Sequence, residues 1–235
     1  MRLLLISNST NAGESYLHHA KNQIKQFLGK KSIRALFVPY AGITISYQDY
    51  ESKVKEKFNE IGHDVISVHY FSDPVERVET ADAIVVGGGN TFRLIQLLQG
   101  NKLIEPIRKK ILTGTPYIGW SAGANITCPT IRTTNDMPVV RPDTFDSLNL
   151  IPFQINPHYL DANPEGHAGE TREMRIDEFI KINTDIYVAG LREGTMFLIE
   201  NDRIQLIGTR NVRIFKYGQS PLEINPGSDL QFLMQ

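Results

Sequence analysis

Short apolar segments that alternate with amphipathic ones restrict the fold of this chain more than any other feature of its sequence. The runs at residues 3–6 and 33–38 are continuous rather than alternating, as in strands buried on both faces of a sheet. Further strands are expected at 65–70, 83–86 and 116–119, with helices at 15–28, 47–61, 90–98 and 103–112. Strands that alternate with helices predict an α/β fold with a mostly parallel, doubly wound sheet and helices on both faces.

The second half of the chain has a different character. Residues 128–150 are rich in Pro, Thr, Asp and Asn, and the segment is too long for a hairpin loop. Short, partly antiparallel strands at the edge of the sheet are predicted at 187–190, 196–200, 203–207 and 212–215. Because no repeat, low-complexity segment or linker divides the sequence, we expect a single domain over residues 1–235.

Charge and cysteine content narrow the kinds of partner. The net charge is −1 with both signs interspersed, so no electrostatic footprint for nucleic acid or an acidic membrane is present. Cys128 is the one cysteine, which excludes an internal disulfide and a multi-cysteine metal site. The N-terminal MRLLLISNST is interpreted as a buried strand rather than a signal peptide, and no apolar stretch is long enough for a membrane-spanning helix. We therefore expect a cytoplasmic protein.

The pentapeptide GWSAG at residues 119–123 lies at the end of the apolar run 116–119 and has the pattern of a nucleophile elbow. In such an elbow a strand turns into a helix within a few residues, and glycines two positions from the serine relieve steric clashes. The helix N-terminus then presents amides, with Ala122 the expected donor, to an oxyanion beside Ser121. A tight strand-to-helix connection without catalytic function is the alternative.

The triple glycine at 87–89 also follows a strand. A dinucleotide-binding turn is disfavoured, because the third position of that fingerprint holds Phe92 and no acidic residue closes a following strand. A turn that needs positive φ angles is a second interpretation. The favoured hypothesis is that the amides of Gly88 and Gly89 complete an oxyanion hole opposite Ser121, since ligand crevices form at the carboxyl ends of parallel strands.

A serine nucleophile needs a base, and the chain has six histidines. His158 is the first candidate, because it follows an apolar run at an expected strand end, beside a rigid proline. His167, in a predicted loop, is the second. The other four histidines are expected to be structural or exposed: His18, His19, His63 and His69.

A carboxylate must orient the histidine, and two acidic residues are candidates. Asp136 lies in the long segment after the elbow, where an Asx turn is its ordinary alternative. Glu193 lies between two short strands, where an exposed hairpin tip is the alternative. Composition does not choose between them.

Two further residues have simple structural interpretations. Arg172 lies at the expected start of a helix, where a solvated arginine is common. Cys128 invites comparison with glutamine amidotransferases, which carry a cysteine in a similar elbow. Here the elbow holds Ser121, so a small buried thiol is expected instead.

Six stretches spread from residue 3 to about 195 carry a family resemblance: LLLISNST, VVGGGNTF, YIGWSAGAN, CPTIRTTNDMP, INPH and EGHAGETRE. Together they resemble the peptidase E family of alpha-aspartyl dipeptidases, whose relatives include cyanophycinase. The resemblance implies a glutaminase-like parallel sheet with Ser121 as nucleophile and His158 as base. It leaves the acid as Asp136 or Glu193. We rank Glu193 first, because it follows a strand of the same sheet and can reach the carboxyl edge beside His158.

The resemblance also implies a substrate, a dipeptide with an N-terminal aspartate, and no metal or organic cofactor. It points to Arg172 as the bidentate partner of the aspartate side chain. A cyanophycinase-like hydrolase of an aspartyl-arginine polymer and a non-enzymatic binder of a small acidic ligand are the alternatives. Glutaminase activity is disfavoured because serine replaces the cysteine.

Overall fold

The computed structural model describes residues 1–235 except 164 and 167. One sheet contains β1 (Arg2–Ile6), β2 (Arg34–Val38), β3 (Asp64–Ser67), β4 (Ile84–Val86), β5 (Tyr117–Trp120), β8 (Met196–Glu200) and β9 (Arg203–Ile207). A second contains β6 (Gln154–Tyr159), β7 (Val188–Arg192), β10 (Val212–Phe215) and β11 (Leu222–Ile224). The α-helices are α1 (Lys21–Leu28), α2 (Tyr47–Asn59), α3 (Pro74–Thr80), α4 (Thr91–Gly100), α5 (Ile104–Leu112), α6 (Ala122–Asn125) and α7 (Arg172–Ile182). Short 3-10 helices are η1 (His18–Ala20), η2 (Val68–Tyr70) and η3 (Gln231–Met234).

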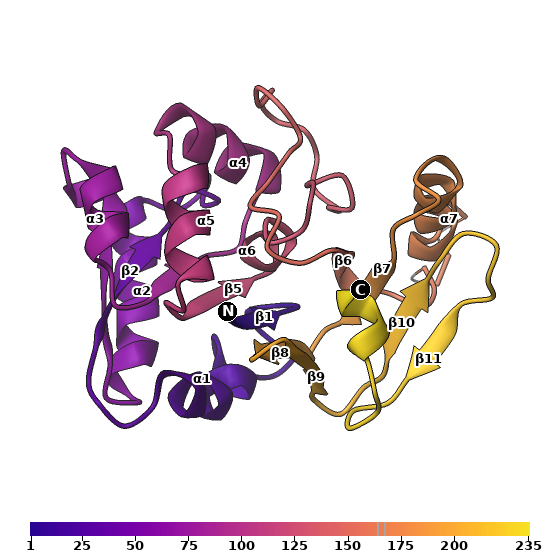
Figure 1. The fold of residues 1–235 in the computed structure, drawn as a ribbon, viewed down its shortest axis with the longest axis horizontal. Helices are drawn as coiled ribbons and strands as arrows, with labels where there is room; N and C mark the ends of the chain where they lie inside the picture. Colours follow the sequence, from indigo (N-terminus) through magenta and orange to yellow (C-terminus); the bar gives the residue numbers. More distant parts are fainter. Residues whose placement is uncertain (164, 167) are drawn as a thin grey trace.

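The main sheet is doubly wound, as predicted. Its order is β3-β2-β4-β5-β1-β8-β9, with parallel pairing from β3 to β1 and antiparallel pairing onward to β9. Within β1, Leu3 and Leu5 belong to the apolar cluster that α3, α4 and α5 cover. Leu4 and Ile6 face the opposite cluster under α1 and α2. In Figure 1, α4 and α5 accordingly lie on one side of β1 and β5 and α1 on the other.

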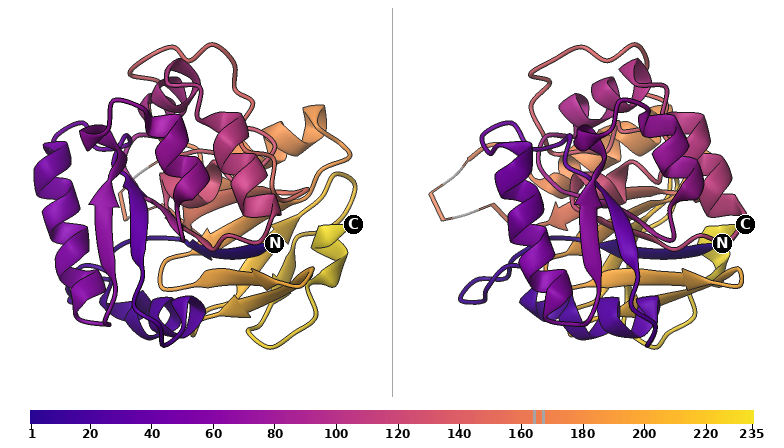
Figure 2. Two further views of the ribbon diagram at one scale, coloured as in Figure 1. Left: turned by 60° about the vertical axis from the view of Figure 1, so that its left-hand side comes forward. Right: turned by 90° about the vertical axis from the view of Figure 1, so that its left-hand side faces the viewer.

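The second sheet corrects one part of the predicted topology. Its order is β11-β10-β7-β6, so β7 and β10 do not belong to the main sheet, whereas β8 and β9 do and β9 is its edge strand. Strand β6 pairs in parallel with β7, and β7 and β11 both pair antiparallel to β10. Apolar patterning identifies a strand but not its pairing partner, which is why the sequence did not separate the sheets. Figure 1 and the left panel of Figure 2 place α2 and the yellow C-terminal strands at opposite sides of the molecule.

Several element boundaries also differ from the predictions. The helix expected at 15–28 begins as a turn, because Leu17 has left-handed backbone angles with φ 55°. The strand expected at 65–70 ends at Ser67 and continues as η2. Helix α3 was not predicted, although Asp73 before a proline is a recognisable start signal and its side chain accepts a hydrogen bond from the third helical residue.

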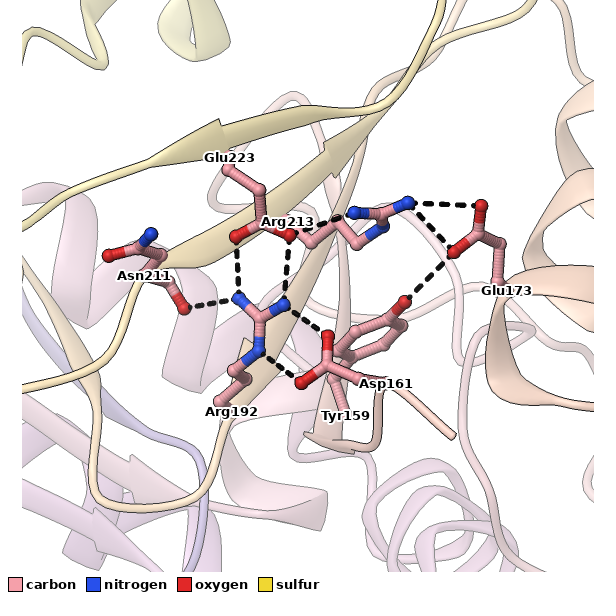
Figure 3. Close-up of polar contacts among 7 residues, drawn as sticks. All are labelled: Tyr159, Asp161, Glu173, Arg192, Asn211, Arg213 and Glu223. Carbon is pink, nitrogen blue, oxygen red and sulfur yellow. Dashed lines mark hydrogen bonds and ion pairs between the residues drawn. The ribbon is translucent and has the colours of Figure 1, made fainter. Parts of the chain in front are cut away.

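A cluster of charged side chains links the elements of the second sheet (Figure 3). Arg192, at the end of β7, donates to Asp161 after β6 and, through both terminal nitrogens at 2.9 Å, to Glu223 on β11. Arg213 on β10 bridges Glu223 and Glu173 of α7. The Arg192 side chain is only 11% exposed, whereas its partners Asp161 and Glu223 are 60% and 37% exposed, so water screens these contacts in part. The cluster therefore ties α7 and the segment after β6 to the strands.

Candidate active site

Ser121 lies at the turn between β5 and α6, in the strand-to-helix elbow that GWSAG predicted. Its backbone has φ 53° and ψ −112°, and its amide donates to Ile6 of β1 at 3.0 Å. Residues other than glycine rarely adopt such backbone angles, so the surrounding contacts must hold Ser121 in this conformation. A Cβ on Gly119 would collide with the carbonyl of Gly123, whose oxygen also accepts a hydrogen bond from the Tyr117 hydroxyl at 2.6 Å. A Cβ on Gly123 would likewise collide with the carbonyl oxygen of Val86, so packing around the elbow requires both glycines.

His158 lies beside Ser121 although it comes from the other sheet. Its Nε2 is 3.0 Å from Ser121 Oγ, which is hydrogen-bonding distance. As the sequence predicted, His158 lies at a strand end: it is the penultimate residue of β6, where φ is 53° and the register shifts between Pro157 and Tyr159. Such a bulge re-aims a side chain, which explains how a residue inside a strand reaches the elbow.

Glu193 completes a line of contacts with these two residues. Its Oε1 is 2.7 Å from Nδ1 of His158, and both side chains are 39% exposed. Glu193 and His158 belong to one sheet, as the ranking expected, but that sheet is not the one that carries Ser121. Glu193 follows β7, which is the parallel neighbour of β6 in the second sheet, whereas Ser121 belongs to the main sheet. The two sheets meet at this site.

Asp136 makes a different set of contacts. Its Oδ2 accepts from the amide and hydroxyl of Thr91 at 2.7 and 2.6 Å and from the hydroxyl of Thr134 at 3.0 Å. A carboxylate at the first turn of α4 is favoured by the helix dipole. Among the contacts of the described residues, none joins Asp136 to His158. Asp136 therefore anchors the 128–150 segment to α4.

Sequence reasoning missed Ser7, which lies where the two sheets meet. Its buried hydroxyl accepts from the amide of His158 at 2.9 Å and donates to the carbonyl of Leu191 at 2.7 Å. The Ser7 amide donates to Thr195 at 3.0 Å, just beyond Glu193. One side chain at the carboxyl end of β1 thus holds the backbones that carry the histidine and the carboxylate. The available signal was a serine directly after the first apolar run.

The predicted oxyanion donors border the serine. A Cβ on Gly88 would lie 3.0 Å from the Ser121 Cβ, so the glycine turn closely approaches the elbow. Over the described part of the chain, the amides of Gly88, Gly89 and Ala122 donate to no protein acceptor. The turn is held by Tyr50, whose hydroxyl donates to the Gly88 carbonyl at 2.9 Å. These amides are available to a ligand beside Ser121.

Arg172 lines a different cavity from that of Ser121 and His158. The larger cavity, about 720 Å³, is lined by residues from the elbow, the glycine turn, α2 and the loops around them: Ser9, Tyr16, Ala41, Gly42, Ile43, Thr44, Ile45, Tyr50, Lys53, Gly88, Gly89, Asn90, Trp120, Ser121, Val139 and His158. Arg172 lines a cavity of about 140 Å³ with Asp136. Burial, and then Arg175, lowers the pKa of Arg172, while the charge of Asp136 opposes this shift. Asn135 of the smaller cavity donates to the carbonyl of Pro157, next to His158, at 2.6 Å.

Two further residues, Cys128 and His167, were considered as reactive groups in the sequence. Cys128 is fully buried, burial raises its pKa to about 12, and its sulfur accepts from the amide of Ile155 at 3.1 Å. It is thus a packed thiol, as expected. His167, the second candidate for the base, lies outside the described residues. Across the described residues, no group of three or more His, Cys, Asp and Glu side chains has the arrangement of a metal site.

A serine in a strained elbow, an imidazole at its hydroxyl and a carboxylate behind the imidazole are the arrangement of serine hydrolases. Comparison with known proteins agrees with that class and specifies it. The model of peptidase family S51 matches residues 3–207, and the chain belongs to this family. The protein is a serine-type peptidase.

Close relatives cover the full chain. It is 50% identical to peptidase E of Nostoc sp. over 100% of this chain and 97% of the relative. It is 47% identical to peptidase E of Streptomyces coelicolor over 100% of this chain and 95% of the relative.

Solved structures share the fold. A Listeria monocytogenes protein assigned to peptidase E matches with a TM-score of 0.66 and 25% identity, covering 88% of this chain and 98% of its own. A peptidase from an acI-B1 Actinobacterium matches with a TM-score of 0.70 and 19% identity over 97% and 96% of the chains, which supports the fold alone. No helix within the described residues is long and apolar enough to span a membrane.

Proposed function

We propose that this protein is a serine dipeptidase that hydrolyses dipeptides with an N-terminal aspartate. One observation carries the chemical part of the proposal: His158 lies 3.0 Å from the Ser121 hydroxyl and 2.7 Å from the Glu193 carboxylate. The relatives named peptidase E support the substrate class.

The first half-reaction is acyl transfer to Ser121. The Ser121 oxygen attacks the peptide carbonyl as its proton passes to Nε2 of His158, and the carboxylate of Glu193 stabilises the resulting imidazolium. Amides of Gly88, Gly89 and Ala122 hydrogen-bond the oxyanion. His158 then gives the proton to the leaving amine as the peptide C–N bond breaks, which leaves an aspartyl ester on Ser121.

The second half-reaction uses water in place of the amine. His158 takes a proton from the water, whose oxygen attacks the ester carbonyl, and returns the proton to the departing Ser121 oxygen. Free aspartate is released and the serine is restored.

Arg172 binds the side-chain carboxylate of the substrate aspartate in this proposal. Its planar guanidinium suits a bidentate carboxylate, and its half-buried position strengthens the pairing. The bond between Asn135 and Pro157 joins its cavity to the strand that carries His158. Arg172→Met should lower the preference for Asp-Leu over Asn-Leu by about a hundredfold, because a hydrogen-bonded ion pair is left half-made.

The decisive experiment is an assay of Ser121→Ala against Asp-Leu, Asn-Leu and an aspartyl-arginine polymer. Hydrolysis of Asp-Leu by the wild type and its loss in the variant are expected. Ser32→Ala, a change at an exposed serine outside the site, is the matched control and should keep full activity. Undiminished turnover by Ser121→Ala contradicts the nucleophile assignment. Release of dipeptides from the polymer, without Asp-Leu hydrolysis, indicates the cyanophycinase-like activity instead.

Two further expectations belong to the same proposal. Residues 1–235 form a single domain, supported by an apolar cluster that includes Leu5 of the main sheet together with Ile155 and Ala189 of the second. A single unfolding transition seen by both fluorescence and circular dichroism is the test. The enzyme works in the cytoplasm, where a sequence with one free cysteine is at no disadvantage. Cell fractionation followed by immunodetection checks this location.

A further inference from the structure

The cavity that contains Ser121 has one strongly basic side chain in its wall. Lys53, on α2, lines it together with Ser121 and His158. Among the residues that line this cavity, Lys53 is the one lysine, and there is no arginine, aspartate or glutamate. Among the ion pairs of the described residues, none involves Lys53. The Lys53 ammonium is therefore available to an anionic group of a ligand in the cavity.

Aromatic contacts connect Lys53 to the nucleophile. Its Nζ lies 4.1 Å from the centroid of the Tyr16 ring, within the range of a cation–π interaction. The Tyr16 ring packs edge-on against Trp120 with centroids 6.1 Å apart, and Trp120 immediately precedes Ser121. Lys53 is thus placed at the wall of the cavity by rings that also pack against the elbow.

Helix α2 is itself fixed to both catalytic turns. Tyr50, one helical turn before Lys53, accepts a hydrogen bond from Nε1 of Trp120 at 3.2 Å and donates one to the Gly88 carbonyl at 2.9 Å. Residues three apart on a helix lie on the same face. The face of α2 that supports the glycine turn therefore also presents Lys53 to the cavity.

The substrate proposed above carries two carboxylates, so it needs two cationic partners. Arg172, in the smaller cavity, is assigned to the aspartate side chain. The other carboxylate is the terminal one of the leaving amino acid, which lies about one residue, roughly 3.8 Å between Cα atoms, beyond the aspartate. We propose that Lys53 binds this terminal carboxylate and thereby selects dipeptides over longer peptides. The inference rests on the proposed function and adds a subsite to it.

A longer peptide has a neutral amide where a dipeptide has its terminal carboxylate. Asp-Leu and Asp-Leu-amide differ at that group alone, so their kcat/KM ratio measures its recognition. The wild type should prefer Asp-Leu by about three- to fivefold, the value of an ion pair at the exposed Lys53 side chain. In Lys53→Met the ratio should fall to about one, with activity on Asp-Leu-amide unchanged within about twofold.

Two variants complete the experiment. Lys55→Met changes a lysine on the same helix that does not line the cavity. The Lys55 Nζ lies 3.2 Å from the Asp64 carboxylate, and the variant should keep the wild-type ratio. Lys53→Arg should restore most of the preference. An equal loss on both substrates in Lys53→Met means that Lys53 is structural, and a retained preference means that another group binds the carboxylate; either overturns the inference. A wild type that cleaves neither substrate contradicts the proposed function itself.

Discussion

Replacing Glu193 by glutamine tests the carboxylate behind the histidine. Glutamine has nearly the same shape and keeps an oxygen that can accept a hydrogen bond from Nδ1 of His158, but it removes the negative charge. In the native site this contact is 2.7 Å and each side chain is 39% exposed. The substitution therefore isolates the electrostatic part of the contact.

The expected magnitude follows from the charges that the reaction creates. His158 becomes positive in the transition state, and two opposite unit charges about 4 Å apart attract by about 4 kcal/mol at an effective dielectric constant of about 20. Solvent screening at 39% exposure reduces this to about 2–3 kcal/mol. Since each 1.36 kcal/mol is a factor of about ten in rate, kcat/KM should fall by about 30- to 150-fold.

The assay is the initial rate of Asp-Leu hydrolysis by Glu193→Gln and by Asp136→Asn, with thermal denaturation of both. Glu193→Gln should lower kcat with little change in KM, because it removes an interaction made in the transition state. Asp136→Asn should instead lower thermal stability, because Asp136 bonds Thr91 and Thr134. A kcat/KM for Glu193→Gln within about threefold of the wild type would refute the reasoning. A selective fall in kcat for Asp136→Asn, at unchanged stability, would reassign the acid.

Two substitutions and one labelling experiment test the packing and charge of the fold. A Cβ at Gly123 would collide with a carbonyl oxygen of β4, so Gly123→Ala should lower the free energy of unfolding by about 2–3 kcal/mol in denaturant titrations. Arg192→Met should lower it by about 2 kcal/mol at pH 7, a value reduced for the exposed Asp161 side chain. Arg192 holds the pKa values of Asp161 and Glu223 below their ordinary range, so its contribution is present above about pH 4 and is lost as the pH falls further. The stabilities of the two proteins should therefore stay apart down to about pH 4 and converge below it. Burial raises the pKa of Cys128 to about 12, so a thiol reagent at pH 8 should label the native protein at least about a hundredfold more slowly than the unfolded one, and equal rates would contradict the buried placement.

Local features of the sequence were sufficient to predict many of the strands, helices and turns of this protein. Continuous apolar runs marked the buried parallel strands, because a strand covered on both faces has no polar alternation. The glycines of GWSAG marked the elbow, because no side chain fits where Gly123 meets β4. The glycine turn and the helix start at Arg172 followed from backbone requirements of the same kind.

Other features depend on which strands become neighbours. The main site lies where two sheets meet, and strand pairing between distant segments leaves no mark in local periodicity. That is why Ser7 was missed, although its hydroxyl bonds the backbones of His158 and Leu191. It is also why an unusual φ at His158, inside β6, was not foreseen.

The choice between Asp136 and Glu193 as the partner of His158 shows this division most clearly. The sequence determined that an elbow serine, a histidine beside a proline and two candidate carboxylates exist, because residue type and local spacing are properties of the chain itself. Only the tertiary structure decided which carboxylate meets the imidazole. The parallel pairing of β6 with β7 brings Glu193 to His158, while the N-terminus of α4 draws Asp136 to Thr91. Contacts between segments far apart in the chain are a consequence of packing, and packing is settled by the whole fold at once.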